Sequence, residues 1–482
     1  MRPSIKILEE DMKEKVVLEA MEILEEIGFF VENTEAVEIL RNAGINVDSE
    51  TQRALIPADL VKKSLKTAPQ SISLYNRDGD FVTVLGGDNI CFDPGSAALN
   101  VLDQETNEIR TAVTKDFVDF TKVVDQLEHI QAQSTAITCS DVPEKISDRY
   151  RLLIALIFSK KPIVTGTFVK ESFEVMKDML VAVRGSEEEL RRKPLAIFDA
   201  CPSPPLKWSD LTCQSIIDCA KYGIPSEFVS MPMTGATAPV TILGSIVQHA
   251  AETLAGLVIT QIVSPGAPVI WGGSPAAFDM RKGTMYLASV DTILMDLGYV
   301  EIGKYLNLPT HAYLGMSDAK ILDTQAGFET GMGSLLAGIK GVNMISGAGM
   351  MNFESTQSIQ KVVIDNEIAG MTYKFVKGIT QRDEPIAKNL LKEFDKKTHL
   401  LSHDHTMKWF REELYLPSTV VDRSTNEEWI TKGRKSIGER ANETVTKLLS
   451  KYPGVSLDND IIEDLTRIMK YENVDFKTKL DL

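Results

Sequence analysis

The sequence lacks the motifs that mark the common nucleotide-binding folds. No GxGxxG turn opens a helix after the first predicted strand, and no GxxxxGK[ST] loop occurs. Lysine and arginine number 52 against 68 aspartates and glutamates, which gives a net charge of −16. Because a protein that binds a nucleic-acid backbone needs a basic face, this charge argues against a nucleic-acid partner.

Cysteine is scarce, and the five cysteines form neither a CxxC pair nor an even framework. This usage favours a reducing compartment, so we expect a cytoplasmic protein. No long apolar run follows the first residues, MRPSIK, so no signal peptide is predicted. The most apolar segment, residues 242–263, includes polar and charged side chains, which predicts a buried core helix and no membrane span.

A regular alternation of apolar runs and helical segments begins near residue 90. Eight such runs over about 270 residues predict the α/β class, as a (β/α)8 (TIM) barrel in residues 90–356. A doubly wound open sheet is the alternative, but it would normally show a phosphate-binding turn. The predicted strands are residues 97–102, 130–138, 162–168, 195–200, 227–231, 268–271, 310–314 and 342–346.

The ends of the chain follow a different pattern. Residues 1–89 predict an α+β cap, with helices at 5–28, 34–42 and 57–65 and a hairpin at 71–85 about the turn 76–79. Residues 357–482 are helical and charged, and they predict a C-terminal helical extension.

Reacting groups on such a barrel come from the carboxyl ends of strands. Here the loops after the strands are rich in Gly, Pro, Ser and Thr and short of charge, which predicts an open, flat mouth with available backbone amides. Trp271 suits the core and the mouth equally, and His311 lies within an apolar run, where a structural histidine is the default interpretation.

Three histidines, His399, His403 and His405, invite a zinc interpretation. Their spacing does not place all three on one helix face, and no HExxH motif accompanies them, so capping or a contribution to the mouth is favoured over a metal site. Cys139 and Cys201 fall at strand ends, where inert small residues are favoured over nucleophiles.

Seven segments of the chain form a distinctive combination: residues 134–143, 199–208, 228–240 (FVSMPMTGATAPV), 269–273, 315–329, 346–350 and 403–406. Together they resemble the trimethylamine methyltransferase family, in its members that lack pyrrolysine. The resemblance covers nearly the whole chain and implies a (β/α)8 barrel, a homo-oligomer, and transfer of a methyl group from an amine nitrogen to Co(I) of a separate corrinoid protein. All 482 residues are standard, which points to the quaternary-amine branch, with glycine betaine as the best-known substrate.

The resemblance fits simple chemistry. A quaternary nitrogen leaves as a neutral tertiary amine, so no general acid is needed, and we expect no catalytic side chain beyond positioning and desolvation. Aromatic faces would hold the ammonium group, and Arg, His or backbone amides would hold a carboxylate. The cage candidates are Phe168, Trp271, Phe278, Tyr313 and Phe328, and the carboxylate candidates are Arg281, His311, His403 and the glycines of residues 346–349, among them Gly347.

No DxHxxG cobalamin-binding signature occurs, so we expect the corrinoid to arrive on its partner protein and no metal or cofactor to reside in this chain. Proline betaine, carnitine and γ-butyrobetaine remain alternative substrates. Two other classes also remain open: a metal-dependent barrel lyase that uses the three histidines, and a non-catalytic betaine-binding subunit.

Overall fold

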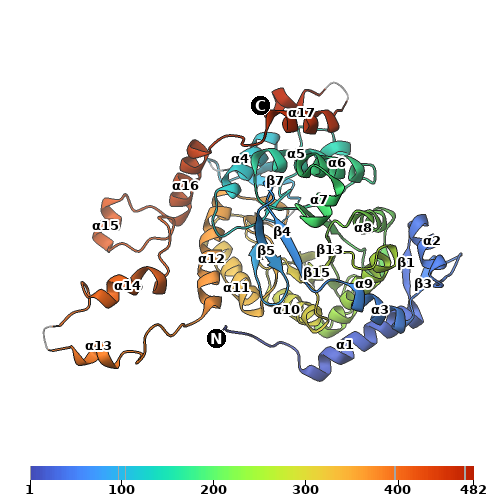
Figure 1. The fold of residues 1–482 in the computed structure, drawn as a ribbon, viewed down its shortest axis with the longest axis horizontal. Coiled ribbons are helices and arrows are strands. Elements are labelled where there is room, and N and C mark those ends of the chain that lie inside the picture. The colour runs from blue at the N-terminus through green and yellow to red at the C-terminus, as the bar shows by residue number, and fades with distance from the viewer. Residues whose placement is uncertain (1, 96, 104, 396–397, 472–473, 482) are drawn as a thin grey trace.

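A ring of parallel strands forms the centre of the structure (Figure 1). The computed structural model describes residues 2–95, 97–103, 105–395, 398–471 and 474–481. Strands and helices alternate along most of this length, so the predicted α/β class is confirmed. The strands of the ring are β6 (Cys91–Phe92), β9 (Gln133–Ser134), β10 (Ile163–Gly166), β11 (Ala196–Ala200), β13 (Ser226–Ser230), β15 (Val269–Gly273), β18 (His311–Ala312) and β19 (Met344–Ile345).

Two sheets make up this strand ring. One has the order β15-β13-β11-β10-β9 and the other β18-β19-β6, and every pairing in both is parallel. A parallel bridge between Trp271 and Thr310 joins β15 to the chain beside β18. On the other side, the amides of Gln131 and Ala132 both donate to the carbonyl of Phe92 at 3.1 Å. Followed in order, these contacts start at β6, pass through β9, β10, β11, β13, β15, β18 and β19, and return to β6.

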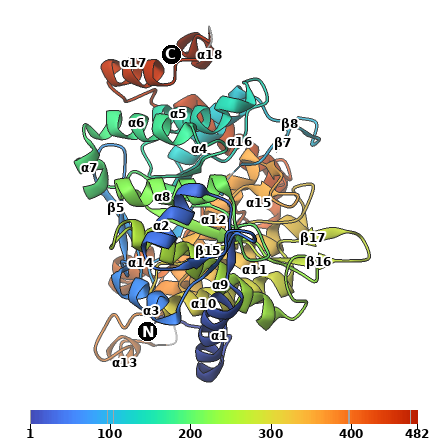
Figure 2. The ribbon, with the colours of Figure 1, turned by 90° about the vertical axis from the view of Figure 1, so that its right-hand side faces the viewer.

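Helices follow these strands and cover the outside of the ring (Figures 1 and 2). Several begin at a side chain that accepts a backbone N–H, as Ser209, Ser289, Asp323 and Ser358 do. They are α4 (Thr114–Asp125), α5 (Ser147–Phe158), α6 (Ser172–Arg184), α7 (Glu187–Arg192), α8 (Asp210–Tyr222), α9 (Ile242–Val263), α10 (Val290–Tyr305), α11 (Thr324–Lys340) and α12 (Ile359–Lys377).

Helix α9 is long and apolar enough to cross a membrane by length and composition. However, 83% of its most apolar 18-residue window is buried inside the protein. It packs against α1 (Glu10–Glu22), α3 (Ala58–Thr67), α8 and α10, which is the behaviour predicted for a core helix.

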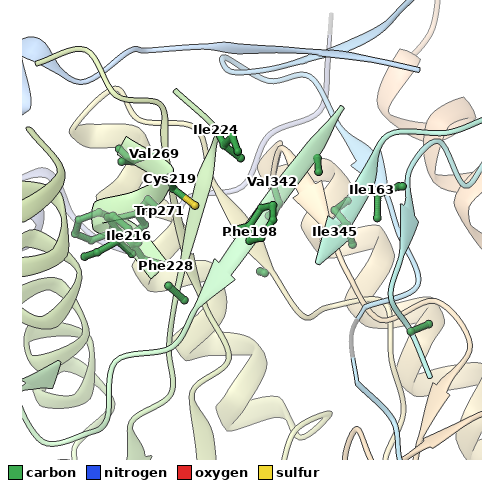
Figure 3. Packing of buried hydrophobic residues seen from close by; sticks show 14 of the residues in the cluster. Ile163, Phe198, Ile216, Cys219, Ile224, Phe228, Val269, Trp271, Val342 and Ile345 are labelled. Carbon is green, nitrogen blue, oxygen red and sulfur yellow. The ribbon is translucent and has the colours of Figure 1, made fainter. Parts of the chain in front are cut away.

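Side chains along the strands alternate between two separate cores, as the pleat requires. Ile163, Phe198, Phe228, Trp271 and Ile345 belong to the large core between the ring and the helices (Figure 3). A second core fills the amino end of the ring and includes the hairpin of β4 (Ile72–Tyr75) and β5 (Phe81–Leu85). Its members are Ile72, Leu74, Leu85, Cys91, Ala132, Val164, Ile197, Ile270 and Met344, so the hairpin closes that end of the ring.

The first predicted barrel strand, residues 97–102, is wrong. The parallel strand is β6, and residues 100–102 form β7 (Asn100–Leu102), which pairs antiparallel with β8 (Ile109–Thr111). Positive φ angles at Gly95 (+73°) and Ala97 (+69°) turn the chain between the two. The apolar stretch around β6 is only three residues long, 90–92, and ends at Asp93, whereas the other predicted runs overlap ring strands.

The N-terminal residues form helices around a small sheet. The predicted helices and the hairpin turn are present, and β12 (Lys207–Trp208) joins the sheet parallel to β1. Besides α1 and α3, the elements are a π-helix (Ile23–Ile27), β1 (Phe29–Val31), α2 (Thr34–Asn42), β2 (Asn46–Val47) and β3 (Arg53–Leu55).

The C-terminal residues are helical, as predicted. Helix α16 packs against α12 and α4, and α17 against α6, whereas α13 to α15 lie apart from the strand ring (Figure 1). These helices are α13 (Lys388–Lys392), α14 (Asp404–Glu413), α15 (Asn426–Thr431), α16 (Ile437–Lys451), α17 (Asn459–Ile468) and α18 (Phe476–Leu480). A 3-10 turn (Glu144–Ile146) and five short strands complete the description: β14 (Met233–Thr234), β16 (Ala276–Asp279), β17 (Thr284–Tyr286), β20 (Met350–Met351) and β21 (Thr356–Gln357).

Candidate active site

Polar and small residues occupy the next inward layer of the strand ring. Six of them follow an inward apolar residue by two positions, as Asp93 follows Cys91 and Asp199 follows Ile197, so the alternation points them into the ring. The other two, Glu227 and His311, face the same way, because a Cβ at Gly272 would lie close to both side chains. This layer therefore lies next to the second core, on its side toward the carboxyl ends of the strands. Its members are Asp93, Ser134, Gly166, Asp199, Glu227, Gly272, His311 and Ser346.

Two glycines make room for the larger members of the layer. A Cβ at Gly272 would lie 2.8 Å from Nδ1 of His311 and 3.2 Å from Cγ of Glu227. A Cβ at Gly166 would lie 3.6 Å from that of Asp199, its register partner. Larger residues at these two positions would fill the space beside the acids and the imidazole.

His311 links the acids on either side of it. Its Nε2 lies 3.0 Å from Oγ of Ser346 and 3.3 Å from Oε1 of Glu227. The Ser346 hydroxyl donates to Oδ1 of Asp93, and the amide of Gly95 donates to Oδ2 of the same carboxyl at 2.9 Å. The chain of contacts therefore runs from Asp93 through Ser346 and His311 to Glu227.

Burial decides the charge states of these groups. Removal from water raises the pKa of Asp93 to about 7. Burial, and then the neighbouring carboxyl charges, raises the pKa of Asp199 and of Glu227 well above their ordinary values. Burial lowers the pKa of His311 to about 3, so its imidazole is neutral at pH 7. We call Asp93, Asp199 and Glu227 the acid cluster.

The acid cluster is short of partners. Among the described residues, no lysine or arginine nitrogen lies within 4.0 Å of its carboxyl oxygens. No N–H or hydroxyl donor among the described residues reaches Oδ1 of Asp199, either carboxyl oxygen of Glu227 or Nδ1 of His311, although the carboxyls of Asp199 and Glu227, which are register partners, face one another. Because buried polar atoms are normally satisfied, this arrangement is suited to a cationic ligand.

An apolar layer surrounds the carboxyl side of the site. The Tyr313 ring meets the His311 ring edge-on, with centroids 5.0 Å apart and planes at 88°. Thioethers and aromatic rings make a soft, polarizable lining. The layer consists of Val229, Ala276, Leu287, Tyr313, Met316 and Met350, with Met231, Met233, Met285 and Phe353 packed against it.

Of the residues selected from the sequence, His311, Tyr313 and Gly347 lie together at this site. Gly347 has φ +110°, and its amide donates to the backbone carbonyl of Asp93 at 3.2 Å. Phe168 follows β10 and is 41% exposed, and its ring centroid lies 4.3 Å from Cζ of Arg151.

Trp271 faces the opposite way. Its Nε1 donates to the carbonyl of Tyr299 at 2.9 Å, and its ring lies beside that of His249, with centroids 5.6 Å apart. The side chain belongs to the core between the strand ring and the helices (Figure 3), so the structure does not bring it into the acid cluster.

The four other selected residues also lie outside the cluster. Phe278 stands opposite Met285 in the β16–β17 hairpin. Arg281 has a side chain that is 86% exposed and binds both carboxyl oxygens of Asp279. Phe328 is 57% exposed on α11. His403 caps α14, and its Nε2 lies 3.4 Å from a carboxyl oxygen of Glu393.

The three C-terminal histidines do not converge on one point. Nε2 of His405 lies 3.2 Å from a carboxyl oxygen of Asp383, whereas His403 faces Glu393. Within the part of the chain that the structure describes, no group of three or more His, Cys, Asp and Glu side chains is placed to hold a metal ion.

The acids were not among the residues selected from the sequence, which included the aromatic residues near the strand ends. Asp93 and Asp199 directly follow short apolar stretches, and Glu227 lies within one. An unpaired acid on the inward face of a buried strand destabilises the fold, so its presence there indicates a functional site. That was the available signal in the sequence.

Comparisons with known proteins identify the family of this chain. The family model described as Trimethylamine methyltransferase (MTTB) matches residues 1–474. The trimethylamine methyltransferase MttB of Methanosarcina barkeri (strain Fusaro / DSM 804) is 34% identical over 457 residues, which cover 93% of this chain and 91% of the relative. The glycine betaine methyltransferase of Desulfitobacterium hafniense (strain Y51) is 29% identical over 461 residues, which cover 95% of each chain.

A solved structure shows the same fold at low sequence identity. The crystal structure of the Methanosarcina barkeri monomethylamine methyltransferase superposes with a TM-score of 0.52 at 12% identity, and the match covers 93% of this chain and 88% of the other. The matched residues 1–474 and the shared fold lead to one conclusion: this chain is a methyltransferase that belongs to the trimethylamine methyltransferase family.

Proposed function

We propose that this protein transfers a methyl group from a quaternary amine to Co(I) of a separate corrinoid protein, with glycine betaine as the first candidate substrate. We also propose that its strand ring is a (β/α)8 barrel, whose carboxyl end would be the active face. Proline betaine, carnitine and γ-butyrobetaine share the ammonium group and remain alternative substrates.

The observation that carries the proposal is the acid cluster, with its unpartnered oxygens beside a neutral imidazole. A quaternary ammonium keeps its positive charge at every pH and cannot surrender a proton to these carboxyls. Its charge would favour ionised Asp199 and Glu227, which burial otherwise disfavours. The substrate would thus supply the countercharge that the site needs.

The chemistry balances without a protein acid. The electron pair of Co(I) forms the new bond to the methyl carbon, the C–N bond breaks, and its electron pair stays on the nitrogen of a neutral tertiary amine. In this scheme the acid cluster holds the cation, and the Tyr313 ring and the methionines around it exclude water and limit the approach of the acceptor to one direction.

The partner would bring the corrinoid to the carboxyl side of the ring, and no cofactor is assigned to this chain. The chemistry of the apolar layer, rich in thioethers and with little charge, supports the approach of a flat macrocycle there. We assign the protein to the cytoplasm, in keeping with its scarce cysteines.

We further propose that the protein is a homo-oligomer. None of the described residues between 377 and 419 is buried, and this segment exposes large apolar side chains, among them Ile379, Leu401 and Met407. A long segment without its own core is normally ordered by a neighbour. Light scattering that gives the mass of one 53.3 kDa chain would contradict this part of the proposal.

The direct test follows cobalt spectroscopically. The purified protein is mixed with a reduced corrinoid protein and a panel of quaternary amines, and loss of Co(I) is measured against formation of methyl-Co(III). Methylation with one or more of the panel is the expected result, and wild-type protein that binds these amines but methylates no cobalt would favour a non-catalytic binding subunit. Asp199→Asn serves as the variant that should lose the activity.

A further inference from the structure

A buried guanidinium with unused hydrogen-bond donors lies beside the acid cluster. Arg151, on α5, is fully buried, and its Nη1 donates to the carbonyl of Thr135 at 2.6 Å. Its Nε and Nη2 are buried without a hydrogen-bond partner. Burial lowers the pKa of Arg151 to about 10, so the guanidinium stays charged at pH 7.

The free edge of this guanidinium has the shape that binds a carboxylate. Nε and Nη2 carry parallel N–H groups, and a carboxylate accepts both at once. Arg281 uses the same two nitrogens to bind both oxygens of Asp279, at 2.9 Å each. Arg192 binds Glu189 through the same pair.

The nearest acid on the same helix is already committed. Oδ1 of Asp148 accepts from the amide of Arg149 and from the hydroxyl of Ser172, and Oδ2 accepts from the amides of Phe168 and Val169. Asp148 therefore fixes the loop after β10 and forms no hydrogen bond with Arg151.

Arg151 lies at the rim of the acid cluster. Thr135, whose carbonyl it binds, directly follows β9, and Phe168, whose ring it faces, lies two residues beyond Gly166. Gly166 is the register partner of Asp199, and the Arg151 charge acts on the Asp199 carboxyl. A cation site and a free anion-binding edge are thus neighbours in the fold.

We propose that Arg151 binds the carboxylate of the substrate through Nε and Nη2, while Asp199 and Glu227 hold the ammonium group. This inference rests on the proposed function and deepens it, because it assigns the residue that binds the carboxylate shared by all four candidate substrates and predicts discrimination against cations that have no carboxylate. Phe168, which covers the guanidinium and is 41% exposed, would have to turn aside as the carboxylate enters. Arg281, selected from the sequence for this role, is occupied by Asp279.

Three small molecules separate the two halves of the site. Glycine betaine carries both charges, tetramethylammonium carries only the cation, and 3,3-dimethylbutyrate is the betaine shape with an uncharged carbon in place of nitrogen. Binding of each is measured by calorimetry to the wild type, to Arg151→Gln, to Arg151→Lys and to Asp199→Asn. Arg151→Lys keeps a positive charge for the Thr135 carbonyl but removes the two-nitrogen edge.

Both Arg151 variants are expected to bind glycine betaine and 3,3-dimethylbutyrate at least tenfold more weakly, with tetramethylammonium changed less than twofold. Asp199→Asn is expected to weaken tetramethylammonium and spare 3,3-dimethylbutyrate. Thermal melts show whether Arg151→Gln folds, and Arg151→Lys decides the question if it does not.

The inference is overturned if folded Arg151 variants bind glycine betaine as tightly as the wild type, or if they lose all three ligands equally. Failure of the proposed function looks different. In that case the wild type binds zwitterions through Arg151 and yet methylates no cobalt.

Discussion

Nε2 of His311 lies 3.3 Å from Oε1 of Glu227, inside a ring of strands whose other inward acids are Asp93 and Asp199. Burial away from water makes the neutral imidazole and the protonated carboxyls the protonation states of lowest free energy for these side chains. A bound cation would reverse that preference for the carboxyls. The predictions below follow from this relationship.

Removing one acid next to the substrate should weaken cation binding. Asp199→Asn and Glu227→Gln keep the shape of the side chain but lose the negative charge, so we expect a loss of roughly 2–4 kcal/mol in tetramethylammonium binding. That corresponds to roughly 30- to 1000-fold weaker affinity by calorimetry. Asp59→Asn, at a side chain that is 97% exposed, is the matched control and should bind normally. Equal tetramethylammonium affinity in all three variants would show that the acid cluster does not bind the cation.

The stability of the unliganded protein should depend on Asp93 and on pH. Its pKa is about 7 in the folded protein against 3.8 ordinarily, so its contribution is present below pH 4 and is lost as pH rises through 7. Asp93→Asn cannot ionise, and it should therefore become more stable relative to the wild type over this range, by at most about 1.4 kcal/mol per pH unit. Urea unfolding at several pH values measures the difference, and His311 affects both proteins alike. A difference that does not change with pH contradicts the assignment.

Gly272 should be intolerant of a side chain. A Cβ there would lie 2.8 Å from Nδ1 of His311 and 2.9 Å from the carbonyl oxygen of Phe228, so Gly272→Ala is expected to destabilise the protein by roughly 1–3 kcal/mol and to reduce methyl transfer. A Cβ added at Gly331 in α11 would have no neighbouring atom within 4 Å. Gly331→Ala should therefore raise the free energy of unfolding by about 0.5–1 kcal/mol. Calorimetric melts of both variants give the comparison, and equal melting temperatures would argue against it.

Two aromatic residues selected from the sequence should behave differently. Trp271→Phe loses the hydrogen bond to Tyr299 and should lower the free energy of unfolding by roughly 1–3 kcal/mol while leaving tetramethylammonium affinity unchanged. Tyr313→Leu removes the aromatic face beside His311 and should weaken that affinity by about 2 kcal/mol. A substrate-binding role for Trp271 would show as the reverse pattern.

Periodicity predicted the class of the fold and most of the ring strands. The run at residues 195–200 contains β11 in full, because a strand buried on both faces is a continuous apolar run. β6 escaped prediction because its apolar stretch is only three residues long, 90–92, and its strand identity comes from pairing with β19. Local sequence does not encode that long-range pairing.

The site was harder to predict because the choice of inward face depends on register. Trp271 and Gly272 are neighbours on one strand, yet Trp271 packs against helices while Gly272 faces His311. The prediction selected Trp271 for its aromatic ring, whereas its neighbour Gly272 is the residue that faces the acid cluster. Arg151 is on a helix, and its closeness to the acids arises only when α5 packs against β10 and the guanidinium reaches the carbonyl of Thr135, just after β9.

The most direct measurement is the change in the cobalt spectrum when Co(I) corrinoid protein, glycine betaine and this protein are combined. The account predicts methyl-Co(III) and one equivalent of dimethylglycine with the wild type, and neither product with Asp199→Asn. If the wild type leaves Co(I) unchanged with glycine betaine, proline betaine, carnitine and γ-butyrobetaine, or if Asp199→Asn methylates cobalt at the wild-type rate, the central claim is contradicted.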